Sequence, residues 1–178
     1  MKYLHMGAVL LLVAAVACGP AQEIPGPQMM PVPVELKRFF LDDLSGVDAS
    51  VGVSLDPAVS SDGHGSLRVD AAEAMVVPLF VVADLSLENG MLIYQASLQS
   101  ADLKGQAYLE MWVRFPGKGE FFSRGLDRAL TGTMTWTTLQ TPFFLRAGEK
   151  PDLIRLNLVV TGTGKVWIDD IRLLRQPL

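Results

Sequence analysis

Residues 108–115 read YLEMWVRF, and this stretch decides the predicted fold class. Apolar and polar side chains alternate along it, which indicates a β-strand with one face in a core, because successive side chains of a strand point to opposite faces. The expected core face carries Leu109, Met111, Val113 and Phe115, and the expected outer face carries Tyr108, Glu110, Trp112 and Arg114. Residues 153–160 alternate in the same way and place Arg155 and Asn157 on an outer face.

Strand patterns recur through the rest of the chain, and no segment shows a sustained period of 3.6 residues. The predicted strands cover residues 36–41, 66–71, 75–82, 91–100, 107–115, 135–145, 153–161 and 165–174. The connections are too short and too polar for the helical crossovers of a parallel sheet. The sequence therefore predicts an all-β fold over residues 35–178, an antiparallel β-sandwich of the jelly-roll type. If residues 91–100 share a sheet with the two strands above, Gln95 and Ser97 extend the same outer face.

Two connections are longer than ordinary hairpin loops. Residues 116–133 contain Phe121 and Phe122, and a long aromatic loop on a rigid scaffold is a candidate binding element. Alternatively, both phenylalanines pack onto the core as a lid. Residues 43–65 are expected to hold an early edge strand that the pattern does not locate.

The N-terminus has the organisation of an export signal. An apolar run (MGAVLLLVAAVA) fills residues 6–17, after Lys2 and before Cys18. A membrane-spanning helix needs about 20 apolar residues, so the shorter run predicts a cleavable signal peptide over residues 1–17. Residues 15–18 (AVAC) resemble a bacterial lipobox, which implies a lipidated Cys18 that holds the exported protein at a membrane of the cell envelope. The alternative is an ordinary signal that is cut after Ala17 and leaves a free thiol.

Residues 19–34 contain five of the 11 prolines and no aromatic residue. Because proline fixes φ and lacks a backbone donor, this stretch predicts an extended tether between Cys18 and the folded domain.

Composition excludes several classes of function. The formal net charge is −4 and no basic run is present, which argues against a nucleic-acid partner. Outside the predicted signal the chain has one histidine, His64, and its single cysteine is Cys18. These residues are too few for a cysteine-rich zinc site or a metal site with paired histidines, and they do not supply an internal Cys/His catalytic dyad. No nucleophile elbow, P-loop or dinucleotide fingerprint occurs. Glu110 is the one carboxylate that we consider as a general acid, and spacing identifies no partner for it. We therefore expect a protein that is not an enzyme.

Four segments carry a family resemblance. Residues 161–174 (TGTGKVWIDDIRLL) resemble the last hairpin of galactose-binding-like jelly rolls, the fold of many carbohydrate-binding modules. Residues 39–46 resemble the first strand of those modules, and residues 54–69 resemble the turn before their second strand. Residues 125–136 resemble the stretch that leads to their tryptophan strand. The resemblance implies a galactose-binding-domain-like fold and favours glycan binding, although the fold by itself does not transfer a function.

Such modules often carry a structural calcium ion. The resemblance implies ligands from Asp42 or Asp43, from Asp169 or Asp170, and from the backbone around Ser66, and oxygen atoms are the ligands that calcium prefers. The chain departs from the pattern at residues 44–45, where many relatives have an aromatic residue followed by glutamate. Alternatively, Asp169 and Asp170 bond to nearby backbone or to an arginine such as Arg172.

Sugar recognition requires an aromatic ring for the apolar side of the sugar and polar groups for its hydroxyls. The predicted ligand-binding residues are Tyr108, Glu110, Trp112, Arg114, Arg155 and Asn157, and Trp136 and Trp167 are expected in the core or at its rim. We therefore predict a membrane-tethered, non-catalytic lipoprotein that binds carbohydrate on one face of a jelly roll. Two alternatives remain: Trp112 is covered by a loop above a merely solvated face, or the protein is an envelope lipoprotein that contacts another protein and has no glycan ligand.

Overall fold

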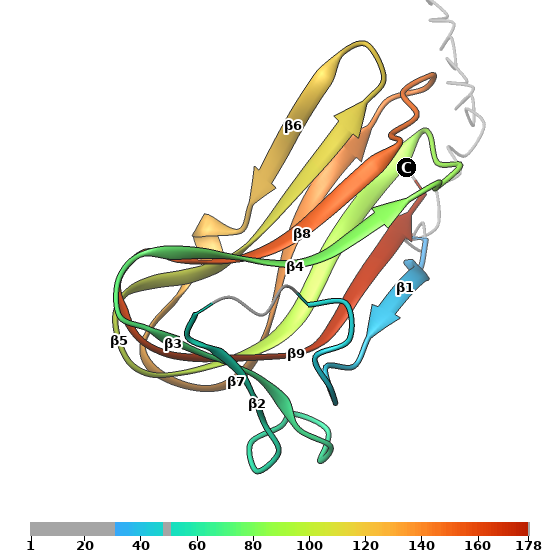
Figure 1. Ribbon diagram of the computed structural model, residues 1–178. Coiled ribbons are helices and arrows are strands. Elements are labelled where there is room, and N and C mark those ends of the chain that lie inside the picture. Colours follow the sequence, from blue (N-terminus) through green and yellow to red (C-terminus); the bar gives the residue numbers. More distant parts are fainter. Residues whose placement is uncertain (1–30, 48–50, 178) are drawn as a thin grey trace, which may run out of the picture. The chain divides into compact units, whose positions relative to one another are not determined.

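A computed structural model describes residues 31–47 and 51–177 (Figure 1). The strands are Val34–Phe39 (β1), Val53–Asp56 (β2), Ser66–Ala71 (β3), Met75–Ala83 (β4), Gly90–Phe115 (β5), Gly119–Arg124 (β6), Leu130–Leu145 (β7), Leu153–Val160 (β8) and Thr163–Gln176 (β9), with a short 3-10 helix at Leu126–Arg128. Within the described ranges, no helix is long and apolar enough to cross a membrane. The expected signal peptide, the lipidated Cys18 and the tether up to residue 30 lie outside the described residues.

The long strand β5 organises the fold because it takes part in both layers of a sandwich. Residues 90–104 of β5 pair with β7 on one side and β9 on the other. From Ala107, where pairing with β7 ends, β5 pairs with β8 on one side, and from Glu110 to Phe115 it pairs with β6 on the other. Between the two halves the register shifts, and the backbone has positive φ at Asp102 and Gly105, which marks the bend.

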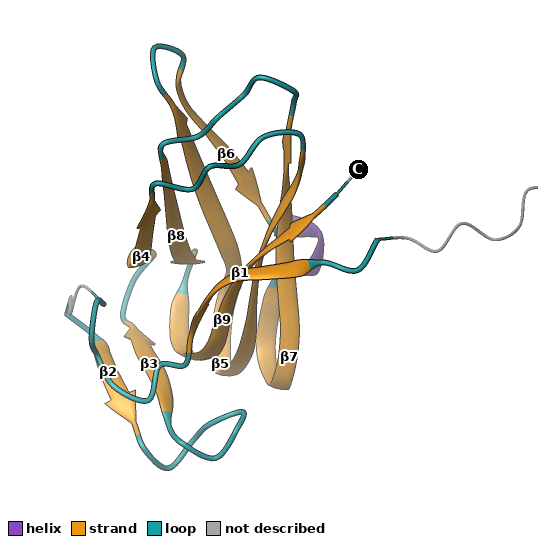
Figure 2. Cartoon of the chain, turned by 90° about the vertical axis from the view of Figure 1, so that its right-hand side faces the viewer, coloured by secondary structure: helices purple, strands orange, loops and turns teal. Residues whose placement is uncertain are grey.

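The first layer therefore has the order β2-β3-β9-β5-β7, and β1 also pairs with β9 (Figure 2). The second layer has the order β4-β8-β5-β6. Every pairing is antiparallel, which confirms the predicted antiparallel β-sandwich.

The core lies between the inward faces of the two layers. The predicted inward residues of YLEMWVRF are all buried, and they pack with alternate residues of β8 and of β9, which confirms the expected core face. At one side of the sandwich, the rings of Phe39 on β1 and Phe80 on β4 stack with centroids 3.8 Å apart and so join the two layers.

Two sequence-based expectations are wrong. Residues 91–100 and 107–115 form one continuous strand that bends between the layers, so Gln95 and Ser97 lie in the first layer and not beside Trp112. Residues 116–133 do not form a long loop, because a turn with positive φ at Gly117 and Gly119 reverses the chain into β6. The expected early edge strand within residues 43–65 is β2.

Candidate functional site

The outer side of the second layer brings the predicted ligand-binding residues together. Trp112 on β5 lies between Arg155 on β8 and Phe122 on β6, and in the next row Glu110 lies between Asn157 and Arg124. We call this surface the Trp112 face; it consists of Tyr108, Glu110, Trp112, Arg114, Glu120, Phe122, Arg124, Arg155 and Asn157, with Pro78 and Val81 of β4. Of the three β6 residues, Phe122 was expected on a binding loop, whereas Glu120 and Arg124 were not predicted, because their segment reads as a loop in the sequence. The glycine-containing turn directly after the alternating strand was the signal for a hairpin.

Glu110 is the hydrogen-bond centre of this face. Its Oε1 accepts bonds from the Trp112 indole N–H at 2.7 Å and from the Asn157 amide at 3.1 Å, and its Oε2 accepts a bond from Arg124 Nε at 2.6 Å. The residue is only 4% exposed. Burial raises the pKa of Glu110, but the bonds from Arg124, Trp112 and Asn157 outweigh burial and hold the pKa below its usual range. The carboxylate therefore stays charged and holds three neighbouring side chains in place.

Trp112 is half-buried and its partners come from adjacent strands. The Phe122 ring lies 5.1 Å away with a 48° tilt, and the Arg155 guanidinium lies 6.0 Å from the Trp112 ring. The Arg124 guanidinium lies 4.5 Å from the Phe122 ring. Trp112 therefore has a fixed orientation within an aromatic and cationic row of side chains.

The two predicted arginines of this face remain accessible. Arg114 forms a bidentate ion pair with Asp152, in which Nε donates to Oδ1 at 2.9 Å and Nη2 to Oδ2 at 3.0 Å. Arg155 donates a hydrogen bond to Glu120 at 2.5 Å. The bond from Arg114 lowers the pKa of Asp152. Both arginines are on the surface, so the free donors of their guanidinium groups can meet a ligand.

A groove runs beside these residues. It has a volume of about 390 Å³ and is lined by Gly46, Pro78, Leu79, Phe80, Val81, Arg155 and Asn157. β4 supplies an apolar wall, on which Val81 is 62% exposed, and β8 supplies the polar wall. Of the six predicted residues, Arg155 and the largely buried Asn157 line the groove, whereas Tyr108 and Glu110 are buried and do not line it.

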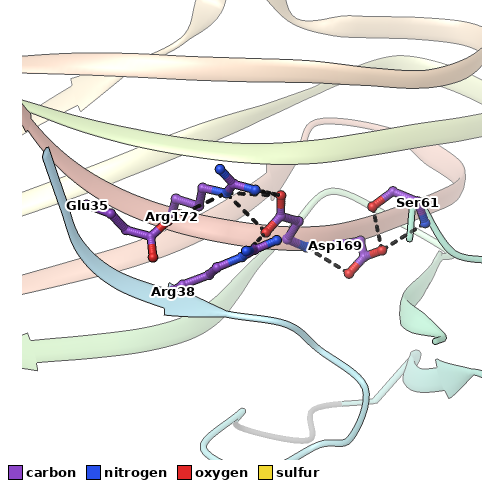
Figure 3. A network of polar contacts seen from close by, with 6 residues as sticks. Glu35, Arg38, Ser61, Asp169 and Arg172 are labelled. Carbon is purple, nitrogen blue, oxygen red and sulfur yellow. Dashed lines mark hydrogen bonds and ion pairs between the residues drawn. The ribbon is translucent and has the colours of Figure 1, made fainter. Parts of the chain in front are cut away.

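The four aspartates expected at a calcium site do not form a ligand set. Asp43 Oδ1 accepts a bond from the Ser45 backbone N–H at 2.7 Å, and Asp42 is exposed beside it. Asp169 is fully buried and accepts bonds from the Ser61 N–H at 2.8 Å, the Ser61 hydroxyl at 2.6 Å and the Asp170 N–H at 2.7 Å (Figure 3). Within residues 31–47 and 51–177, no three histidine, cysteine or carboxylate side chains gather as metal ligands.

Asp170 contacts two arginines instead. Arg38 Nε bonds to it at 2.6 Å and Arg172 Nη2 at 2.7 Å, which links β1 to β9 (Figure 3). Burial raises the pKa of Asp170, but the bonds from Arg172 and Arg38 outweigh burial and lower the pKa overall. The contact with Arg172 confirms the alternative considered for this aspartate. A calcium ion would meet two guanidinium groups here, so these residues do not fit the ion.

The other aromatic candidates lie as follows. Trp167 is buried and its indole N–H bonds to Asp56 at 2.9 Å, and Trp136 is half-buried on β7, as expected for core or rim positions. Phe121 and Phe122 are 49% and 52% exposed on opposite faces of β6. The Phe121 ring packs edge-on against the buried Phe115 with centroids 5.9 Å apart, whereas Phe122 packs against Trp112, so the expectation of a lid on the core holds in part for Phe121 and is wrong for Phe122.

Neither a protein-family model nor a curated protein sequence matches the chain. Solved structures do share its fold. The CBM22-1 xylan-binding domain from Paenibacillus barcinonensis Xyn10C aligns with a TM-score of 0.59 at 14% identity, over 84% of this chain and 99% of that domain. A family 16 carbohydrate-binding module aligns with a TM-score of 0.52 at 14% identity, over 73% of this chain and 91% of that one. TmCBM61, solved with β-1,4-galactotriose, aligns with a TM-score of 0.51 at 14% identity, over 76% and 92% of the two chains. The described domain therefore has the jelly-roll fold of carbohydrate-binding modules.

Proposed function

We propose that this protein binds a carbohydrate on the Trp112 face without catalysing a reaction, and that a lipidated Cys18 holds it at a membrane of the cell envelope. The observation that carries the proposal is the position of Trp112, between Phe122 and Arg155 and beside the 390 Å³ groove. An aromatic ring fixed next to guanidinium and amide groups is what the two sides of a sugar require. The structural neighbours, one named as xylan-binding and one solved with a galactotriose, support the same class of ligand.

The charges of the Trp112 face favour a neutral glycan. Each of its three arginines is paired with a carboxylate: Arg114 with Asp152, Arg124 with Glu110 and Arg155 with Glu120. A charged sugar would have to displace one of these partners, whereas a neutral sugar can use the donors that remain.

A non-catalytic role is supported by the state of Glu110. A general acid needs a raised pKa and access to the substrate, whereas Glu110 has a lowered pKa and both of its oxygens are bonded within the protein.

The proposal is tested by titrating the full chain with soluble xylo- and galacto-oligosaccharides, followed by calorimetry and tryptophan fluorescence. We expect Trp112→Ala to weaken binding by roughly tenfold or more, because loss of a stacked aromatic ring removes at least about 1.4 kcal/mol. The matched control is Phe144→Ala, which removes a 61% exposed ring from β7 in the other layer and should leave binding unchanged. Binding by a folded Trp112→Ala variant at the wild-type affinity would exclude this face.

A second candidate function, contact with an envelope protein, is favoured by a separate apolar cleft. This cleft of about 320 Å³ is lined by Phe115, Phe121, Phe143, Phe144, Arg146 and Glu149. Neighbouring residues of β6 supply a matched pair of variants, because Phe121 faces this cleft and Phe122 faces Trp112. Loss of a cross-linked envelope partner in Phe121→Ser but not in Phe122→Ser would support this second function, and the reverse result would contradict it.

A further inference from the structure

The outer side of the first layer carries a second set of polar residues in register. Gln95 on β5 lies opposite Gln140 on β7, and Ser97 lies opposite Thr138. A register shift next to Leu98 brings Trp136 of β7 beside Gln99, and Gln99 lies opposite Trp167 on its other side. We call this surface the amide face; it consists of Gln95, Ser97, Gln99, Trp136, Thr138 and Gln140 (Figure 2 shows the three strands β7, β5 and β9 side by side).

The polar groups of the amide face are available to a ligand. Its five polar side chains are exposed or half-exposed, and none of them bonds to another side chain or to backbone within the described part of the chain. The nearby Ser100 and Thr137 differ, because their hydroxyls bond to the carbonyls of Gly132 and Thr135. Each free amide can both donate and accept a hydrogen bond.

The β2–β3 connection fixes one border of the amide face. Ser61 of this connection bonds to the buried Asp169 of β9 (Figure 3). Asp169 is the residue opposite Ser97. At the end of β2, Asp56 accepts the indole N–H of Trp167, and the Ser66 hydroxyl bonds to the Val59 carbonyl at 2.6 Å. The border is therefore held to β9 at two residues, Trp167 and Asp169.

The amide face carries no net charge. Its own six residues are uncharged, the neighbouring Arg172, opposite Gln95, is paired with Asp170, and the carboxylate of Asp169, opposite Ser97, is fully buried and bonded to Ser61. An anionic or cationic polymer would find no counter-charge here, whereas a neutral polymer with many hydroxyls complements the surface.

We propose that the amide face is a second carbohydrate-binding surface, which takes an extended, neutral polysaccharide. Amides and hydroxyls pair with sugar hydroxyls, and Trp136 supplies the aromatic ring. The residues lie along neighbouring strands of a sheet, so each sugar makes few contacts and several consecutive sugars are needed for useful affinity. The inference rests on the proposed function in one respect, that the domain binds carbohydrate, but it uses the layer opposite the Trp112 face.

The test separates the two surfaces by the length of the ligand. Retention of the full chain is measured on insoluble xylan and on insoluble β-1,4-galactan. The same protein samples are then titrated with the soluble oligosaccharides used for the Trp112 face. We expect the double variant Gln99→Ala/Trp136→Ala to lower retention on at least one polymer by roughly tenfold, which is equivalent to losing one to three net hydrogen bonds. The affinity for the soluble oligosaccharides should stay unchanged. The control Gln106→Ala/Phe40→Ala removes one exposed amide and one exposed ring outside both proposed surfaces, and should be retained like the wild type.

A variant with only amide changes, Gln95→Ala/Gln99→Ala/Gln140→Ala, keeps the test decisive if loss of Trp136 prevents folding. Retention of this folded variant at the wild-type level overturns the inference, as does the absence of wild-type retention on both polymers. If retention depends on the amides while the oligosaccharides do not bind, the amide face stands and the proposed site on the Trp112 face fails. If Trp112→Ala alone abolishes both retention and titration, the Trp112 face is the sole site and the inference fails.

Discussion

Replacing Glu110 by glutamine should destabilise the protein more than any other conservative change on the Trp112 face. Glutamine keeps one acceptor oxygen but puts an NH2 group where the second oxygen was. Because all three partners of Glu110 are donors, this NH2 group faces another donor: either Arg124 Nε, or Trp112 Nε1 together with Asn157 Nδ2. Hydrogen bonds to a charged group contribute about 1.5–3 kcal/mol each, and Arg124 recovers part of this by hydration because its side chain is 39% exposed. We expect a loss of about 2 kcal/mol in the free energy of unfolding.

Urea unfolding, followed by tryptophan fluorescence, measures this loss. With a slope of about 2 kcal/mol per molar urea, the midpoint should fall by roughly 1 M. Glu120→Gln is the matched control, because Glu120 pairs with Arg155 at the surface and such pairs contribute about 0–1 kcal/mol. The reasoning is refuted if Glu110→Gln shifts the midpoint no more than Glu120→Gln does.

The same carboxylate sets a direction for acid unfolding. The pKa of Glu110 is lower in the folded protein than in the unfolded chain, where it is about 4.3. The charged carboxylate therefore contributes its full stabilisation above the unfolded pKa, and this contribution is lost as the pH falls through the folded pKa. The difference in stability between the wild type and Glu110→Gln should therefore shrink below about pH 4. A difference that stays constant from pH 7 to pH 3 contradicts the lowered pKa.

Three further predictions concern the rest of the domain. Tyr94→Phe should stabilise the protein by about 1 kcal/mol in urea unfolding, because the Tyr94 hydroxyl is fully buried without a partner in the described chain; a loss of stability would contradict this. Gly162→Ala should cost about 3 kcal/mol or prevent folding, because its new Cβ would overlap the Lys104 carbonyl; an unchanged melting temperature would show that the backbone there can move. Calcium or a chelator should not shift the melting temperature, because Asp170 is paired with Arg38 and Arg172; a calcium-dependent rise would restore the metal site.

The sequence by itself determined the fold class and the inward face of the strands. The alternation in YLEMWVRF correctly placed Leu109, Met111 and Val113 in the core, because the period of a strand is fixed and hydrophobic burial acts on each side chain separately. The same alternation placed Trp112 and Arg155 on outer faces, and the register shows that they are direct neighbours. The likeness to carbohydrate-binding jelly rolls was also apparent from short segments, because turn chemistry is local.

Only the tertiary structure decided which strands are neighbours. A strand pattern shows where side chains point and does not identify the partner strand, so the bend that carries β5 from one layer to the other had no clear local signature. That bend separates Gln95 and Ser97 from Trp112 and creates the amide face. The pairing of Arg38 with Asp170, 132 residues apart, likewise depends on β1 lying beside β9. Long-range pairing is selected by the fit of both partners within the whole sandwich, and for that reason Asp170, which was expected to bind calcium, pairs with Arg38 and Arg172 instead.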